Sequence, residues 1–84
     1  MRKSIHTAQH KRLLALLREI RLEAGLTQAQ LAECLKTDQT VISKIESGER
    51  RVDVLELREI CEAVGITLES FVRKLEKSLK SNPE

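Results

Sequence analysis

The sequence contains few aromatic residues, prolines, glycines and cysteines. Its 84 residues include no tryptophan or tyrosine and a single phenylalanine, Phe71, so the core has to be built from aliphatic side chains. This shortage argues against a protein that reads single strands by stacking bases on a platform of rings. The one proline, Pro83, lies near the end, and the three glycines lie at positions 25, 48 and 65. Such spacing suits an all-helical chain whose helices stop at glycines.

Metal ligands and catalytic groups are also sparse. Cys34 and Cys61 do not form a CxxC pair and have no clustered histidines, so a zinc site is not expected. His6 and His10 have metal-ligand spacing for a helix, but two ligands alone make a weak site, and we interpret them as solvent-facing. No Gly-rich phosphate loop and no nucleophile beside a base is evident. We therefore predict that the protein is not an enzyme and holds no cofactor or metal ion.

The length and hydropathy of the chain predict one small domain. No signal peptide is evident, and no apolar run approaches the about 20 residues that cross a membrane. These features predict a cytoplasmic protein with reduced thiols and no membrane partner. The chain is 40% hydrophobic and 33% charged, which is typical of a folded protein. We expect a single domain over residues 1–84, with its core over about residues 7–73.

Charge is unevenly distributed along the chain. The net charge is only +2, but residues 1–26 carry six Lys/Arg and two Asp/Glu, whereas residues 52–84 carry five and seven. The basic end favours a polyanionic partner. An ordinary solvated surface explains the same counts, and charge alone favours that alternative.

Caps and apolar spacing predict five helices. Thr27 with Gln30, and Asp53 with Glu56, have the spacing of capping boxes. Two further N-caps are expected at Asp38 and Thr67. The predicted helices cover residues 7–25, 28–35, 39–47, 54–65 and 68–79. The fourth helix is expected to bury Leu55, Leu57, Ile60, Cys61 and Val64. Helices so closely connected form a compact all-α bundle.

The second and third helices are joined by about three residues, the spacing of a helix-turn-helix. On the third helix, Ile42 and Ile45 are predicted to point into the core. The opposite face carries four polar side chains, Gln39, Thr40, Ser43 and Lys44. A short helix with such a face can read base edges in the major groove of DNA. The same residues could form an ordinary solvated face, and physical reasoning alone leaves the two interpretations balanced.

Two segments of the chain resemble a known family. LTQAQLAECL (residues 26–35), a short turn and QTVISKIESGER (residues 39–50) are similar to the phage-repressor helix-turn-helix family, called Cro/cI-like or XRE-type. The segment VGITL (residues 64–68) and Phe71 fit the family pattern as well. The resemblance covers about residues 13–72 and implies a lambda-repressor-like DNA-binding fold of five helices.

The resemblance also implies roles for individual residues. The four polar residues of the third helix fall on the family's base-reading positions. Phosphate contacts are implied for Gln28, Lys36, Thr37, Arg50 and Arg51. A solvated charged turn is the alternative for the two arginines. Arg21 and Glu46 match a family ion pair between the first and third helices, with a phosphate contact as the alternative for Arg21.

Three positions depart from the family pattern or lie outside it. Lys36 occupies a turn position where the family often has glycine, so the backbone is strained there or the turn differs. Asp38 puts a negative charge near phosphate, which we attribute to capping. Arg2 and Lys3 could reach DNA as an arm, although a frayed terminus explains them better.

Members of this family usually act as two-fold dimers, since one small module contacts too few base pairs to specify a single site in a genome. Leu68, Val72, Leu75 and Leu79 follow a four-three-four spacing along the fifth helix. Leu75 and Leu79, in the extension over residues 74–80, are predicted to pack on a second subunit. The alternative is a helix that folds back on its own domain.

These observations predict a sequence-specific regulator of transcription that binds double-stranded DNA. We expect a dimeric repressor or autoregulatory controller that binds a palindromic operator, without a small-molecule ligand domain. Restriction-modification controllers, phage or plasmid repressors and antitoxins all fit this description. A protein partner such as a toxin or RNA polymerase fits it too. The alternative function is an antitoxin or other module whose main partner is a protein.

Overall fold

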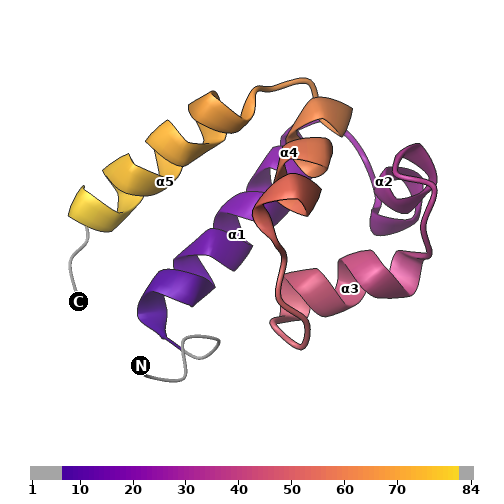
Figure 1. The fold of residues 1–84 in the computed structure, drawn as a ribbon, viewed down its shortest axis with the longest axis horizontal. Coiled ribbons are helices and arrows are strands. Elements are labelled where there is room, and N and C mark those ends of the chain that lie inside the picture. Colours follow the sequence, from indigo (N-terminus) through magenta and orange to yellow (C-terminus); the bar gives the residue numbers. More distant parts are fainter. Residues whose placement is uncertain (1–6, 82–84) are drawn as a thin grey trace.

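The computed structural model describes residues 7–81, which form five α-helices (Figure 1). The helices are α1 (Ala8–Glu23), α2 (Gln28–Cys34), α3 (Gln39–Ser47), α4 (Val54–Ala63) and α5 (Leu68–Ser81). The prediction of an all-α bundle with a helix-turn-helix at its second and third helices is confirmed. The predictions made for Arg2, Lys3 and His6 fall outside the described residues.

Most helices begin at the caps that the sequence predicted. Thr27 Oγ1 accepts the Gln30 N–H at 3.1 Å, and the Gln30 side chain accepts the Thr27 N–H at 2.9 Å. Asp53 and Glu56 form the same reciprocal box at the start of α4. Asp38 occupies the N-cap of α3, but its side chain makes no capping hydrogen bond. Asp38 is therefore the N-cap residue that the sequence predicted, but the hydrogen bond expected of its carboxylate is not formed.

Four helices, α1 to α4, end in the same hydrogen-bonded turn. In α2 the Lys36 N–H donates to Glu33 O and the Thr37 N–H donates to Ala32 O, the two bonds of a Schellman motif. Equivalent pairs of bonds end α1, α3 and α4. This motif requires a left-handed residue, which is glycine in α1, α3 and α4 but Lys36, with φ of 57°, in α2. The turn position held by Lys36 is thus strained, one of the two outcomes that the sequence left open.

The core is aliphatic apart from one aromatic ring. The described helices contribute ten buried apolar side chains, from Leu16, Leu17, Ile20, Leu31, Ala32, Ile42, Ile45, Ile60, Cys61 and Phe71. The prediction that Leu55 is buried was wrong, since 70% of it is exposed. Position 55 lies roughly 140° around the helix from Ile60, because each residue advances an α-helix by about 100°. Leu57 and Val64 are half-buried against the core.

The first helix separates α3 from α5 (Figure 1). Both helices pack against α1, and α3 packs more extensively on α2. Leu75 is half-buried against the core of its own domain, and the Arg12 side chain donates to Ser78 Oγ at 3.2 Å. Thus α5 folds back along α1, which was the alternative left open for it. Leu79 is half-buried, and its expected contact with a second subunit stays a prediction.

Candidate nucleic-acid interface

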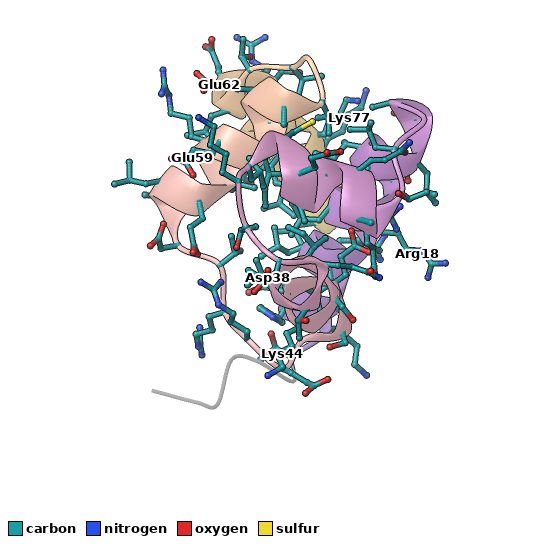
Figure 2. The ribbon with its side chains drawn as sticks, turned by 90° about the vertical axis from the view of Figure 1, so that its right-hand side faces the viewer. Arg18, Asp38, Lys44, Glu59, Glu62 and Lys77 are labelled. Carbon is teal, nitrogen blue, oxygen red and sulfur yellow. The ribbon has the colours of Figure 1, made fainter. Side chains whose placement is uncertain are left out.

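The outer face of α3 carries the polar residues that the sequence singled out. Ile42 and Ile45 are buried and fasten α3 to the core. On the other side, Gln39, Thr40 and Lys44 are exposed and Ser43 is half-buried. Figure 2 shows Lys44 projecting away from the body of the molecule. The helix therefore presents a polar surface about two turns long on a rigidly anchored backbone.

A buried ion pair fixes α3 against α1. Arg21 Nε lies 2.7 Å from Glu46 Oε2, and Arg21 Nη2 donates to Glu46 Oε1 at 3.0 Å. The third nitrogen, Nη1, donates to the carbonyl of Leu26 at 2.8 Å. Both side chains are more than nine-tenths buried. Arg21 thus forms the ion pair that the family resemblance implied, and each of its three guanidinium nitrogens donates a hydrogen bond within the protein.

Gln28 extends this ion pair to the outer face of α3. Its Nε2 donates to Glu46 Oε1 at 3.0 Å, and its Oε1 accepts from Gln39 Nε2 at 3.4 Å. The second bond is long and therefore weak. Sequence reasoning assigned Gln28 to phosphate and missed both contacts, because they join residues 18 and 11 positions apart. The result is a chain of contacts from the core to Gln39, one of the residues predicted to read bases.

The charge of Glu46 is stabilised where it lies. Burial alone would raise the pKa of this carboxyl, but hydrogen bonds from Arg21 and Gln28 outweigh it. The charges of Arg21 and Arg18 act in the same direction, and the pKa falls below its ordinary value. Glu46 is therefore ionised at neutral pH and holds its partners as charge-assisted acceptors.

The turn between α2 and α3 places Lys36 and Thr37 at the surface. Both side chains are exposed. The two residues lie two and three positions after Cys34, the last residue of α2. Their position beside the N-terminus of α3 is compatible with the phosphate contacts that the resemblance implied.

The loop after α3 holds Arg50 in a way that the sequence did not predict. Arg50 Nη2 lies 2.6 Å from Glu56 Oε2, and Nη1 donates both to Glu56 Oε1 at 3.2 Å and to Arg51 O at 3.0 Å. Glu56 was expected as half of a capping box and as part of a solvated acidic face, not as the partner of Arg50. Arg51 is exposed at the surface of the same loop. The two arginines, treated alike from sequence, therefore have different environments.

Other kinds of site find little support in the described part of the chain. Residues 7–81 contain no group of three or more His, Cys, Asp or Glu side chains placed to hold a metal ion. Over the same residues, no helix combines the length and the apolar character that crossing a membrane requires.

Comparison with known proteins places this geometry in a family. A profile described as helix-turn-helix matches residues 17–71. The control protein C.MunI of a Mycoplasma species is 36% identical over 62 residues, which span 73% of this chain and 84% of that protein.

Two solved structures have the same fold. An XRE-family like protein from Pseudomonas syringae pv. tomato superposes with a TM-score of 0.81 at 42% identity, covering 90% of this chain and 93% of that one. The clp gene regulator ClgR from Corynebacterium glutamicum gives a TM-score of 0.76 at 26% identity, covering 88% and 79%. The chain belongs to the XRE-type helix-turn-helix family of DNA-binding transcription regulators.

Proposed function

We propose that this protein is a sequence-specific regulator that inserts α3 into the major groove of a palindromic operator. The observation that carries the proposal is the chain of contacts from Arg21 through Glu46 and Gln28 to Gln39. A base-reading side chain is effective when its position is set before binding, because less freedom is then lost on contact. Side chains of an ordinary solvated surface have no function that depends on a fixed position, so a connection to the core would not be expected for them.

The chemistry of the α3 face supports direct reading of bases. Gln39 can pair with the N6 and N7 groups of adenine, and Lys44 can donate to O6 and N7 of guanine. The methyl group of Thr40 can contact a thymine methyl, and the Ser43 hydroxyl can serve either kind of base. Phosphates on either side would be met by Gln28, Lys36, Thr37 and Arg51. The N-terminus of α2, with its free N–H groups, favours the contact at Gln28.

A homodimer is the second part of the proposal. Three of the large apolar side chains exposed on the described residues lie on α4 and α5, namely Val54, Leu55 and Val72. Of these two helices, α5 is separated from α3 by α1 (Figure 1), so a partner subunit on α5 leaves the DNA-reading face open. Similarity to the control protein C.MunI favours an autoregulatory controller. The same apolar side chains would suit a different protein, such as a toxin, if this chain were an antitoxin.

Selection of duplexes from a random library at two salt concentrations tests the proposal. We expect a palindromic motif whose affinity falls steeply with salt, because a reader of duplex DNA releases counterions from each phosphate that it neutralises. Gln39→Ala should then relax one position in each half-site. Enrichment of no duplex at either salt concentration would refute DNA reading by α3. A toxin, restriction enzyme or phage protein encoded beside this chain would separate the remaining controller, repressor and antitoxin roles.

A further inference from the structure

Arg50 and Glu56 form a two-point ion pair next to the proposed DNA-reading helix. The two guanidinium nitrogens contact the two carboxylate oxygens at 2.6 and 3.2 Å. Their hydrogen bond raises the pKa of Arg50 and lowers the pKa of Glu56. The side chains are 38% and 34% exposed, so solvent and other ligands can reach the pair. An ion pair this exposed is weak enough to exchange partners.

The pair lies where a phosphate contact is expected. Arg50 follows the end of α3 by three residues, and it lines one surface depression together with Thr37 and Val41. Three of the five N–H donors of its guanidinium are used, two by Glu56 and one by the carbonyl of Arg51. A phosphate arriving here therefore meets a cation whose charge is already balanced by a carboxylate.

We propose that Glu56 limits the affinity of this protein for DNA by holding Arg50 as a neutral pair. Arg50 contributes its full charge to a phosphate only when the pair with Glu56 opens. This inference rests on the proposed function. It makes Glu56 a residue that lowers the affinity for DNA, in contrast to the residues proposed above, which raise it. Such a residue weakens binding to every duplex alike, because the phosphate contact carries no sequence information.

The variant Glu56→Gln removes the charge and can keep the helix cap. Glutamine already makes this cap elsewhere in the chain, where Gln30 Oε1 accepts the Thr27 N–H at 2.9 Å. For each bound subunit, we expect Glu56→Gln to tighten duplex binding by up to about eightfold at 0.1 M salt and to steepen the logarithmic salt slope by about 0.9, since one more phosphate is neutralised. Affinity is measured by titration of a labelled duplex at several salt concentrations.

A matched control lies on the same helix. Glu62 is paired with Arg58 at 3.3 Å, and Figure 2 shows it far from Lys44 of α3. Glu62→Gln changes the net charge by the same amount as Glu56→Gln but releases a cation away from the proposed interface. We expect it to leave the salt slope unchanged. In the double variant Arg50→Ala/Glu56→Gln the gain should disappear, because the released cation is absent.

The outcomes separate this inference from the proposed function. Failure of the unmodified protein to bind any duplex overturns the proposed function. If that protein binds and Glu56→Gln binds equally or more weakly at the same slope, the role given to Glu56 is overturned. Carboxylate chemical shifts measured by NMR on the unmodified protein give a test without substitution. We expect the Glu56 signal to move when duplex is added, and a signal that stays in place contradicts the opening of the pair.

Discussion

Lys36 has a backbone conformation that most side chains avoid. A left-handed conformation costs an L-residue about 1–2 kcal/mol, and glycine escapes this cost but loses more chain entropy on folding. The three equivalent turns of the described residues use Gly25, Gly48 and Gly65. A lysine at the fourth turn is consistent with a use for its charge, and a phosphate contact is the use proposed above.

The substitution Lys36→Gly should separate stability from DNA binding. We expect the free energy of unfolding to rise by about 0.5–1 kcal/mol, because relief of the left-handed strain outweighs the added chain entropy. The salt slope of DNA binding should become shallower by about 0.9 for each bound subunit, the contribution of one phosphate. Urea denaturation and duplex titration measure the two effects. The control Lys36→Asn removes the charge but tolerates the conformation, so it should share the shallower slope.

Glu46 makes the stability of the fold depend on pH. Its pKa is lowered in the folded state, so its contribution is fully present above the ordinary value of 4.5 and is lost as the pH falls through the folded pKa. Glu46→Gln should lower the free energy of unfolding by roughly 3 kcal/mol at neutral pH, because it leaves Arg21 buried without a charged partner. The free energy of unfolding of Glu46→Gln should also fall less on acidification than that of the unmodified protein, because the variant has no carboxylate to protonate at this position.

Thermal unfolding monitored by circular dichroism between pH 3 and 7 measures both effects. Glu59→Gln is the control, since this exposed carboxylate on α4 takes part in no ion pair among the described residues. An equal loss of stability in the two variants would contradict the importance of the buried pair.

At the scale of an element, the end of α3 depends on a glycine that no other residue can replace cheaply. Gly48 has φ of 86°, and a methyl group added there would lie 3.2 Å from Leu14 Cδ1 on α1. The turn therefore combines a left-handed backbone with a close approach of two helices. It sets the point at which the chain leaves α3 and brings Arg50 toward α4.

Gly48→Ala should be more destabilising than the same change at another helix end. Gly65 has φ of 87°, but a methyl group added to it meets no atom within 4 Å. Both variants bear the strain of the left-handed backbone, and Gly48→Ala should lose about 1 kcal/mol more because Leu14 must move. Chemical denaturation of the two variants gives the difference. Equal losses would mean that Leu14 adapts without cost.

The elements were predictable where their signals are local. The capping box of Thr27 and Gln30 involves residues three apart, and sequence alone identified it correctly. Leu55 was misplaced because its apolar character counted for more than its angular position on α4. The bonds of Gln28 and Arg50 were missed because each side chain has several suitable partners, and only the packing of the helices selects among them. The base-reading and phosphate-binding roles are contacts with DNA, so the structure of the protein alone does not test them and they stay predictions.

At the scale of the whole molecule, α1 stands between a helix proposed to read DNA and a helix proposed to meet a second subunit. Val72 and Leu79 are seven residues apart and therefore lie on the same side of α5. Val72 is exposed and Leu79 is half-buried, whereas Leu75 packs into the domain. This arrangement favours Val72 and Leu79 over Leu75 as residues to test, because a charge at Leu75 would also disturb the core.

Val72→Glu/Leu79→Glu should convert a dimer to a folded monomer. Like charges facing one another across a two-fold contact oppose association, and the change should weaken binding to a palindromic site more than to an isolated half-site. Sedimentation equilibrium gives the mass and circular dichroism checks the fold. Leu22→Glu, at another exposed apolar position but on α1, serves as control and should stay dimeric. A dimer that survives the double substitution contradicts the role of this side of α5.

The contact between Gln28 and Gln39 has a consequence for how operator preference can change. Within residues 7–81, the side chains of Thr40, Ser43 and Lys44 make no hydrogen bond of their own, so they can be exchanged without breaking a hydrogen bond to a neighbour. Gln39 cannot, because its replacement also frees the amide that touches Glu46. Relatives that diverge in operator sequence should therefore do so first at the base pairs facing the three independent positions. A change at the fourth, Gln39, should be accompanied by a change at position 28 more often than a change at the other three.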